Sequence, residues 1–325
     1  MVKSTSIVFS LAVPALAAPS CSWSSWKNVK NMFIFGDSYT QTGFNITSTQ
    51  PNPTNPFGNP PYPGYTSSNG PNWIDFLATT YNASFIRAYN LAYGGATVDS
   101  ALVTPYAPTV LSLVDQVHAE FLPRYGAHPK DVPWTSKDSL FAFFIGINDV
   151  GNSWWLNNST LYDTIFTRYA GLLDDVYKTG ARNFLFLSVP PVNLAPLTLS
   201  KDDGGYAVET EGKVILDWNK RLGAMTKAFK KRHAEVQVFV HDTYKVFDDV
   251  IKNPKAYTQT SAYKNVTGYC AAYENGTPTW YTKDPSCQYA VNEYLWLNSL
   301  HPTFPMHNAT AASVAKFLGT QKCSK

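Results

Sequence analysis

The stretch that decides the fold is NMFIFGDSYTQTGF, residues 31–44. An apolar run, Met32–Phe35, stops at Gly36-Asp37-Ser38-Tyr39. A short apolar run that ends in a polar turn is typical of a buried strand. The serine in this turn has two interpretations: either the turn only ends the strand, or the strand holds the serine in place for chemistry.

The rest of the chain alternates apolar runs with helical patterns. Two segments have helical spacing, one around residues 161–176 and one from about Val208 to Arg232. This alternation predicts an α/β fold with a parallel sheet covered by helices on both faces. The further strand candidates are Ile86–Leu91, Leu140–Ile145, Phe184–Val189 and Val236–Val240.

Three turns should meet at one edge of this sheet, because sites in such folds gather at the carboxyl ends of the strands. Ser38 follows the first strand, Gly94-Gly95 the second and Gly146-Ile147-Asn148-Asp149 the third. In acyl transfer, backbone N–H groups and amide side chains stabilise the oxyanion of the tetrahedral intermediate. The Gly95 N–H and the Asn148 amide are candidates for that role.

A serine nucleophile needs a positioned base, which is usually histidine. His301 is the candidate, since it lies in WLNSLHPTFPMH, where Pro302 fixes an extended backbone ahead of a C-terminal helical segment. The residues expected to be exposed or structural are His118, His128, His233 and His241.

The sequence resembles the SGNH/GDSL hydrolases, whose four blocks occur here in the family's order as FGDSYT (35–40), YNLAYGGATVD (89–99), GIND (146–149) and LHPT (300–303). Together with GPNW at 70–73, these motifs look most like fungal acetylesterases of carbohydrate esterase family sixteen. The resemblance extends from about Phe33 to His307. It implies a flavodoxin-like three-layer α/β/α sandwich with a five-stranded parallel sheet.

The resemblance also implies the roles of individual residues. Ser38 matches the nucleophile and His301 the general base, while Gly95, Asn148 and the Ser38 N–H match the oxyanion donors. The family's usual acid stands three residues before the histidine, where this chain has Asn298. We expect Asn298 to orient the histidine ring; a Ser–His dyad oriented by a backbone carbonyl is the alternative.

Two acids beside these motifs are expected to be structural. Asp37 adjoins the serine on a strand, so its side chain points the other way and should stabilise the turn. Asp149 should be a buried hydrogen-bonding partner of the neighbouring loops.

Four aromatic residues are expected at the mouth of the site, where rings can stack on sugar faces: Tyr39, Trp73, Trp154 and Trp155. The alternative is that at least half of them pack in the core. Residues 51–71 contain seven prolines and predict either a surface loop or a stiff wall beside Ser38.

The first residues have the pattern of a secretory signal, with cleavage after Ala17, so the sequence predicts a signal at 1–17 and one catalytic domain at 18–325. Removal of the signal takes away Lys3 and lowers the formal charge from +3 to +2. A net charge this small excludes a protein that binds nucleic acid. No later segment predicts a membrane span. We therefore expect a secreted, monomeric protein.

Cysteines and sequons agree with secretion. Four cysteines allow three disulfide connectivities, of which we favour a local Cys270–Cys287 staple and a Cys21–Cys323 clip between the chain ends. A metal site is not expected, because the sequence has no closely spaced Cys/His pairs. The candidate glycosylation sites are Asn45, Asn82, Asn157, Asn158, Asn265, Asn275 and Asn308.

Together these features predict a secreted serine esterase that hydrolyses acetyl esters on carbohydrate, such as xylo-oligosaccharides, through an acetyl-Ser38 intermediate without metal or cofactor. Two alternatives stay open: a GDSL-type lipase or phospholipase that acts on longer acyl chains, and a secreted carbohydrate-binding protein with impaired catalysis.

Overall fold

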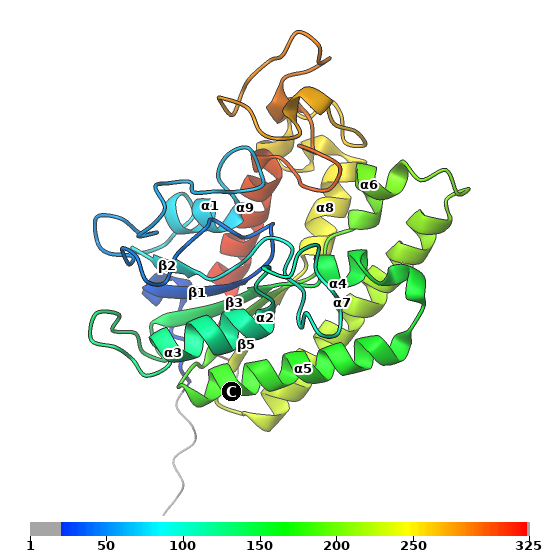
Figure 1. Cartoon of the computed structure of the whole chain (residues 1–325). Helices are drawn as coiled ribbons and strands as arrows, with labels where there is room; N and C mark the ends of the chain where they lie inside the picture. The colour runs from blue at the N-terminus through cyan, green and yellow to red at the C-terminus, as the bar shows by residue number, and fades with distance from the viewer. Residues whose placement is uncertain (1–20, 324–325) are drawn as a thin grey trace, which may run out of the picture.

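A five-stranded, all-parallel sheet forms the centre of the molecule in a computed structural model that describes residues 21–323. The strand order is β2-β1-β3-β4-β5 (Figure 1). The strands are β1 (Asn31–Gly36), β2 (Arg87–Asn90), β3 (Ser139–Phe144), β4 (Asn183–Leu187) and β5 (Gln237–His241). All five lie where the apolar runs predicted them, with ends shifted by one or two residues. The expected signal at residues 1–17 lies outside the described residues.

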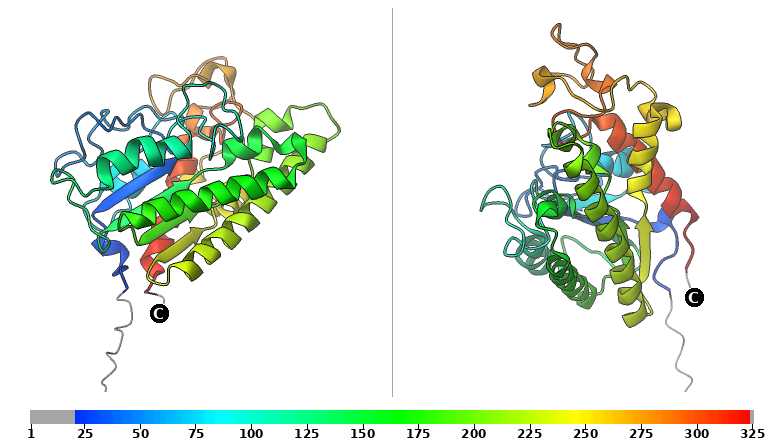
Figure 2. Two further views of the ribbon diagram at one scale, coloured as in Figure 1. Left: turned by 60° about the horizontal axis from the view of Figure 1, so that its bottom comes forward. Right: turned by 90° about the vertical axis from the view of Figure 1, so that its right-hand side faces the viewer.

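Helices cover both faces of the sheet and confirm the three-layer prediction. In Figure 2, α3, α5 and α7 lie over one face, and α1 and α9 lie over the other. Within residues 21–323, no helix is both long and apolar enough to cross a membrane. The helices are α1 (Trp73–Thr79), α2 (Leu113–Asp115), α3 (Leu122–Tyr125), α4 (Ile147–Gly151), α5 (Ser159–Lys178), α6 (Pro196–Leu199), α7 (Tyr206–Arg232), α8 (Thr243–Lys252) and α9 (Phe304–Thr320), with a π-helical turn, η2 (Gln116–Phe121), between α2 and α3.

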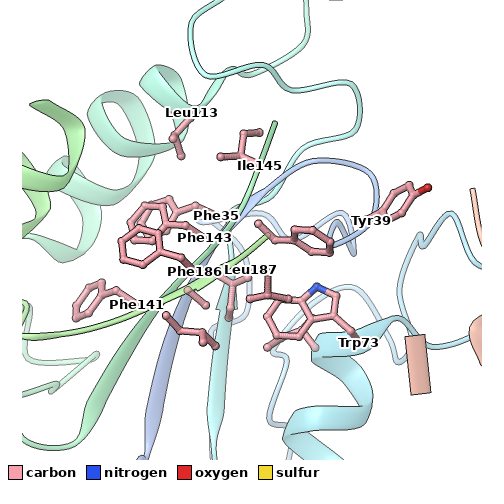
Figure 3. Packing of buried hydrophobic residues seen from close by; sticks show 14 of the residues in the cluster. Phe35, Tyr39, Trp73, Leu113, Phe141, Phe143, Ile145, Phe186 and Leu187 are labelled. Carbon is pink, nitrogen blue, oxygen red and sulfur yellow. The ribbon is translucent and has the colours of Figure 1, made fainter. Parts of the chain in front are cut away.

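Phenylalanine rings run across the sheet on one face, because side chains of a strand alternate between faces and the register is parallel. Phe35 pairs with Phe143 of β3, and Phe143 with Phe186 of β4. The stacked ring centroids are 4.7 Å apart in the first pair and 5.5 Å in the second (Figure 3). This packing fixes the end of β1, and therefore the turn that follows it.

Residues 270–297 form a segment with a small core of its own, which we call the capping segment. It contains the Cys270–Cys287 disulfide and a buried cluster that includes Tyr273, Val291 and Tyr294. Figure 1 shows this segment, coloured orange, above the main body at the carboxyl end of the sheet. The second disulfide, Cys21–Cys323, joins the two ends of the described chain. Both bonds have the pairing that we favoured from the sequence.

Candidate active site

The turn after β1 holds Ser38 in a fixed position. The Asp37 carbonyl accepts hydrogen bonds from the N–H groups of Thr40 and Gln41 at 3.0 and 2.9 Å. The Asp37 carboxylate accepts the Tyr39 N–H at 3.0 Å, which confirms its expected role in the turn. Burial raises the pKa of Asp37 to about 7.

Gln116 of η2 holds the end of β1 with two hydrogen bonds and was not predicted from the sequence. Its Oε1 accepts the Gly36 N–H at 2.9 Å, and its Nε2 donates to the Gly36 carbonyl at 2.8 Å. No sequence pattern marks this contact, because the partners are 80 positions apart.

His301 lies between Ser38 and Asn298. Its Nε2 is 2.8 Å from the Ser38 Oγ, and its Nδ1 is 3.1 Å from the Asn298 Oδ1. The same Oδ1 accepts the backbone N–H groups of Leu300 and His301, at 3.1 and 2.9 Å. A backbone N–H can only donate, so this Asn298 atom is the accepting oxygen, and Nδ1 carries the ring hydrogen. Nε2 is left as an acceptor for the Ser38 hydroxyl.

The protonation state of His301 follows from its surroundings. Burial lowers its pKa to about 4, because the interior disfavours the charged imidazolium. Asn298 carries no negative charge that would raise the pKa again. At neutral pH the ring is therefore uncharged and able to accept a proton.

Gly95 and Asn148 lie on either side of the serine turn, since β1 stands between β2 and β3 in the sheet. Gly95 has a φ of +82°, which favours glycine, and a Cβ there would come within 2.3 Å of the Tyr106 ring. Asn148, at the start of α4, is half-buried, and its Nδ2 donates to the Ala96 carbonyl at 2.9 Å. One of its two amide hydrogens is thus used for position, and the second is left for a ligand.

Asp149 joins the two loops that carry these donors. Both of its carboxylate oxygens lie 3.1 Å from the Val98 N–H, and burial raises its pKa to about 7. This contact confirms the expected role of Asp149 as a buried partner of the neighbouring loop.

The expectation that Tyr39 and Trp73 bind substrate is wrong. Both side chains are 0% exposed, so neither can stack on a ligand. The Tyr39 hydroxyl donates to the Leu300 carbonyl at 2.6 Å, and the Trp73 Nε1 donates to the Thr40 Oγ1 at 2.9 Å. Figure 3 shows both rings among the buried side chains. Their hydrogen bonds hold the residues around Ser38 and His301 in place.

The other two aromatic residues lie beside Asn148. Trp154 is buried, whereas Trp155 is 53% exposed. Both line a small cavity of about 130 Å³ together with Asn148 and Leu300. Of the four expected stacking residues, Trp155 alone presents most of its surface to solvent.

A larger cavity of about 680 Å³ opens on the histidine side of the site. It lies between the end of the proline-rich loop, residues 63–70, and the part of the capping segment at 274–280, and is lined by His301 and Asn298. The proline-rich loop is therefore a wall of a cavity beside the site. The opposite wall, in the capping segment, was not predicted from the sequence.

The four histidines expected to be exposed or structural lie outside the site. His118 contacts Asp175 at 2.9 Å, and His233 contacts Asp174 at 2.8 Å. The ring nitrogens of His128 contact two backbone carbonyls, while the buried His241 contacts the hydroxyls of Thr243 and Ser313.

The structure argues against one glycosylation candidate, Asn308. It lies inside α9 with its Oδ1 accepting the Tyr81 hydroxyl at 2.6 Å, and its sequon partner Thr310 is buried. The Asn308 side chain is thus already engaged in a contact within the fold. The remaining candidates are exposed at Asn45, Asn157, Asn158 and Asn275 and half-buried at Asn82 and Asn265.

Comparisons with known proteins agree with this geometry. The pattern of the GDSL-like lipases/acylhydrolases matches residues 32–312. An acetylesterase of Thermothelomyces thermophilus is 38% identical over 290 residues, which cover 89% of this chain and 88% of the relative. An acetylesterase of Hypocrea jecorina is 26% identical over 322 residues, covering 88% of this chain and 87% of the relative.

Among solved structures, the fold is similar to that of an acetylxylan esterase from Geobacillus stearothermophilus, with a TM-score of 0.50. The match covers 91% of this chain and 97% of that protein at 14% sequence identity. At this identity the likeness concerns the fold alone.

Proposed function

The chain belongs to the GDSL-like lipase/acylhydrolase family and is a carboxylic ester hydrolase of the acetylesterase type, and from this premise we propose that it releases acetate from acetylated oligosaccharides with Ser38 as the nucleophile. The observation that carries the proposal is the 2.8 Å contact between the Ser38 Oγ and an Nε2 of His301 that is free to accept a proton. The contact falls within the range expected of a nucleophile and its base.

Acylation begins when the Ser38 Oγ attacks the acetyl carbonyl carbon and its proton passes to the His301 Nε2. The carbonyl oxygen becomes negative and faces the N–H groups of Ser38 and Gly95 and the free amide hydrogen of Asn148. His301 then gives its proton to the oxygen of the departing sugar as the carbon–oxygen bond breaks. The product of this half is acetyl-Ser38.

Deacylation repeats the sequence with water. His301 takes a proton from the water while the water oxygen attacks the acetyl carbon, and the oxyanion donors again stabilise the negative oxygen. The intermediate collapses to acetate, and Ser38 recovers its proton from His301. No cofactor or metal enters these steps.

Asn298 orients the ring during both halves. Its Oδ1 holds the hydrogen on Nδ1, so that Nε2 keeps its lone pair toward Ser38. It adds no charge to stabilise the imidazolium. The proposed triad therefore works by orientation.

The two alternatives explain less of the geometry. A lipase needs an extended apolar surface for a long acyl chain, whereas the cavity beside Asn148 has a volume of only about 130 Å³. A carbohydrate-binding protein without catalysis has no need of a histidine whose free Nε2 is held against a serine hydroxyl. Acetyl transfer from a sugar uses both features.

Secretion is part of the proposal. The two disulfides support it, since disulfide bonds form and persist in oxidising compartments. A signal at residues 1–17, glycans at the exposed sequons and a monomeric state belong to the same proposal.

The test is acetate release from acetylated xylo-oligosaccharides by the wild type and by Ser38→Ala, with a long-chain ester alongside. Acetate from the wild type only supports the proposal. Turnover of the long-chain ester without acetate release indicates a lipase. No turnover of either substrate by the folded wild type contradicts the proposed substrate class.

A further inference from the structure

The cavity beside His301 lies where the alcohol half of an ester must go. In the proposed reaction, which this inference presupposes, His301 protonates the departing sugar oxygen, so the sugar lies on the histidine side of the acetyl carbon. We propose that the 680 Å³ cavity is the sugar-binding site, that Trp280 is its stacking surface, and that Glu274 makes it select neutral over acidic sugars.

The chemistry of the walls fits a carbohydrate. One wall carries Thr66 and Asn69, and the other carries Thr277, so that both walls present hydroxyl or amide groups, the side-chain types that bind sugar hydroxyls. Trp280 is the aromatic residue in the lining, and it is partly exposed. A cavity with a single flat ring and many hydroxyl and amide groups matches the apolar face and polar edge of a pyranose.

The two walls are joined, so the cavity is held open without a ligand. The Asn69 Nδ2 donates to the Thr277 Oγ1 at 2.8 Å, and the Thr277 N–H donates to the Asn69 Oδ1 at 2.7 Å. The Cys270–Cys287 disulfide and the small core of the capping segment hold the second wall. In Figure 1 this orange segment stands over the blue loop that carries the first wall. A preformed site loses less conformational entropy on binding.

Trp280 is braced at its place in the wall. Its ring centroid lies 5.7 Å from that of Phe304, the first residue of α9. The next residue, Tyr281, also contacts Phe304, at 5.5 Å, but it is 63% exposed and does not line the cavity. The chain thus offers a matched pair of neighbouring aromatic residues, of which one lines the cavity.

The charge of the cavity is set by Glu274. It is the one acidic residue among the lining residues, which include no lysine or arginine. The backbone carbonyl of Glu274 also accepts the Asn298 Nδ2 at 3.4 Å, which ties the residue to the side chain that orients His301. A negative charge at this place repels a carboxylate on the sugar, and the repulsion weakens with salt because Glu274 is exposed.

The stacking role is tested with Trp280→Ala against Tyr281→Ala, on acetylated xylo-oligosaccharides and on p-nitrophenyl acetate, an ester without a sugar. We expect Trp280→Ala to lower kcat/KM for the oligosaccharide by about tenfold or more through KM, with the small ester unchanged. Tyr281→Ala should stay within about twofold of the wild type on both substrates. Equal effects of the two variants, or no effect of Trp280→Ala, would overturn this role.

The proposed effect of the Glu274 charge is tested with Glu274→Gln on two acetylated oligosaccharides, one neutral and one that carries a uronic acid. We expect the wild type to prefer the neutral substrate, by about 3–10-fold at low salt, and the variant to lose most of that preference. A preference that survives the substitution, or that salt does not change, would overturn it. Because Asn275 lines the cavity and lies in a sequon, all proteins are deglycosylated first.

The small ester also separates this inference from the proposed function. A folded wild type that fails to hydrolyse p-nitrophenyl acetate contradicts the serine esterase itself. Normal hydrolysis of the small ester, combined with an oligosaccharide KM that neither Trp280→Ala nor Glu274→Gln changes, contradicts only the assignment of this cavity.

Discussion

The Asn298 Oδ1 lies 3.1 Å from the Nδ1 of His301 and also accepts the backbone N–H of His301 at 2.9 Å. One oxygen therefore fixes both the ring and the backbone of the same residue. In the proposed triad this geometry supplies the orienting part, while the electrostatic part is missing because an amide is neutral.

Asn298→Asp should shift the pH dependence of kcat/KM. The His301 pKa is lowered to about 4 by burial, so the wild type should stay active well below neutral pH. A carboxylate beside Nδ1 stabilises the imidazolium and raises that pKa, which moves the acidic limb of the profile to higher pH. The plateau of kcat should rise as well, within the ~10⁴ that serine proteases lose in the opposite replacement.

The pH profile of kcat/KM, measured from about pH 3 to 9, checks this prediction, with Asn298→Ala as the variant that lacks an acceptor. An unaltered acidic limb in Asn298→Asp, together with full activity in Asn298→Ala, would make Asn298 a bystander.

Asn148→Ala should lower kcat for acetyl esters by about 10²–10³ with little change in KM, because the lost donor acts on the oxyanion of the transition state. Steady-state kinetics measure the two constants separately. Asn152→Ala is the control, since the Asn152 Nδ2 donates to the Thr104 carbonyl at 3.3 Å from the end of the same helix. Similar losses in both variants would show a general effect on α4.

Tyr39→Phe should slow the reaction although Tyr39 does not touch the substrate. Its hydroxyl joins the residue next to the nucleophile to Leu300, the residue before the base. Without this bond, His301 is held less firmly against Ser38, and we expect kcat to fall by about tenfold at an unchanged KM. A variant that is less stable but has the wild-type kcat would assign Tyr39 a structural role only.

Asp149→Ala should unfold more easily than Asp149→Asn. The alanine leaves the buried Val98 N–H without an acceptor, which costs about 1–3 kcal/mol, whereas asparagine keeps one oxygen in place. Urea unfolding compares the two variants. Equal stabilities would mean that the contact with Val98 contributes nothing.

The free energy of unfolding should also depend on pH through Asp149. Burial raises the Asp149 pKa from 3.8 to about 7, so the folded state holds a proton that the unfolded state has released. The contribution of Asp149 to stability is therefore fully present below pH 3.8 and is lost progressively as the pH rises from there through about 7. Asp149→Asn should lose less stability than the wild type over this interval.

The sequence predicted the sheet because buried parallel strands are continuous apolar runs. It also brought together Ser38, Gly95 and Asn148, since each follows a strand and parallel strands end at one edge. The order of the motifs then singled out His301.

The prediction that Tyr39 binds substrate failed because neighbouring residues of a strand point to opposite sides of the sheet. The alternation that excluded Asp37 from catalysis applies equally to Tyr39, which also adjoins Ser38 and turns into the core. The cavity beside His301 could not be predicted from the sequence for another reason. Its walls meet through Asn69 and Thr277, 208 positions apart, and nothing in either segment marks the partner.

The most direct test of the central claim is to trap the acyl intermediate. Wild-type enzyme is mixed with acetylated xylo-oligosaccharide, quenched in acid within one turnover, and digested for mass spectrometry, with Ser38→Ala treated in parallel. The account predicts one acetyl group on the peptide that contains Ser38, at the serine itself, and none in the variant. Acetate release at the wild-type rate with no acetyl on Ser38, or from Ser38→Ala, would contradict it.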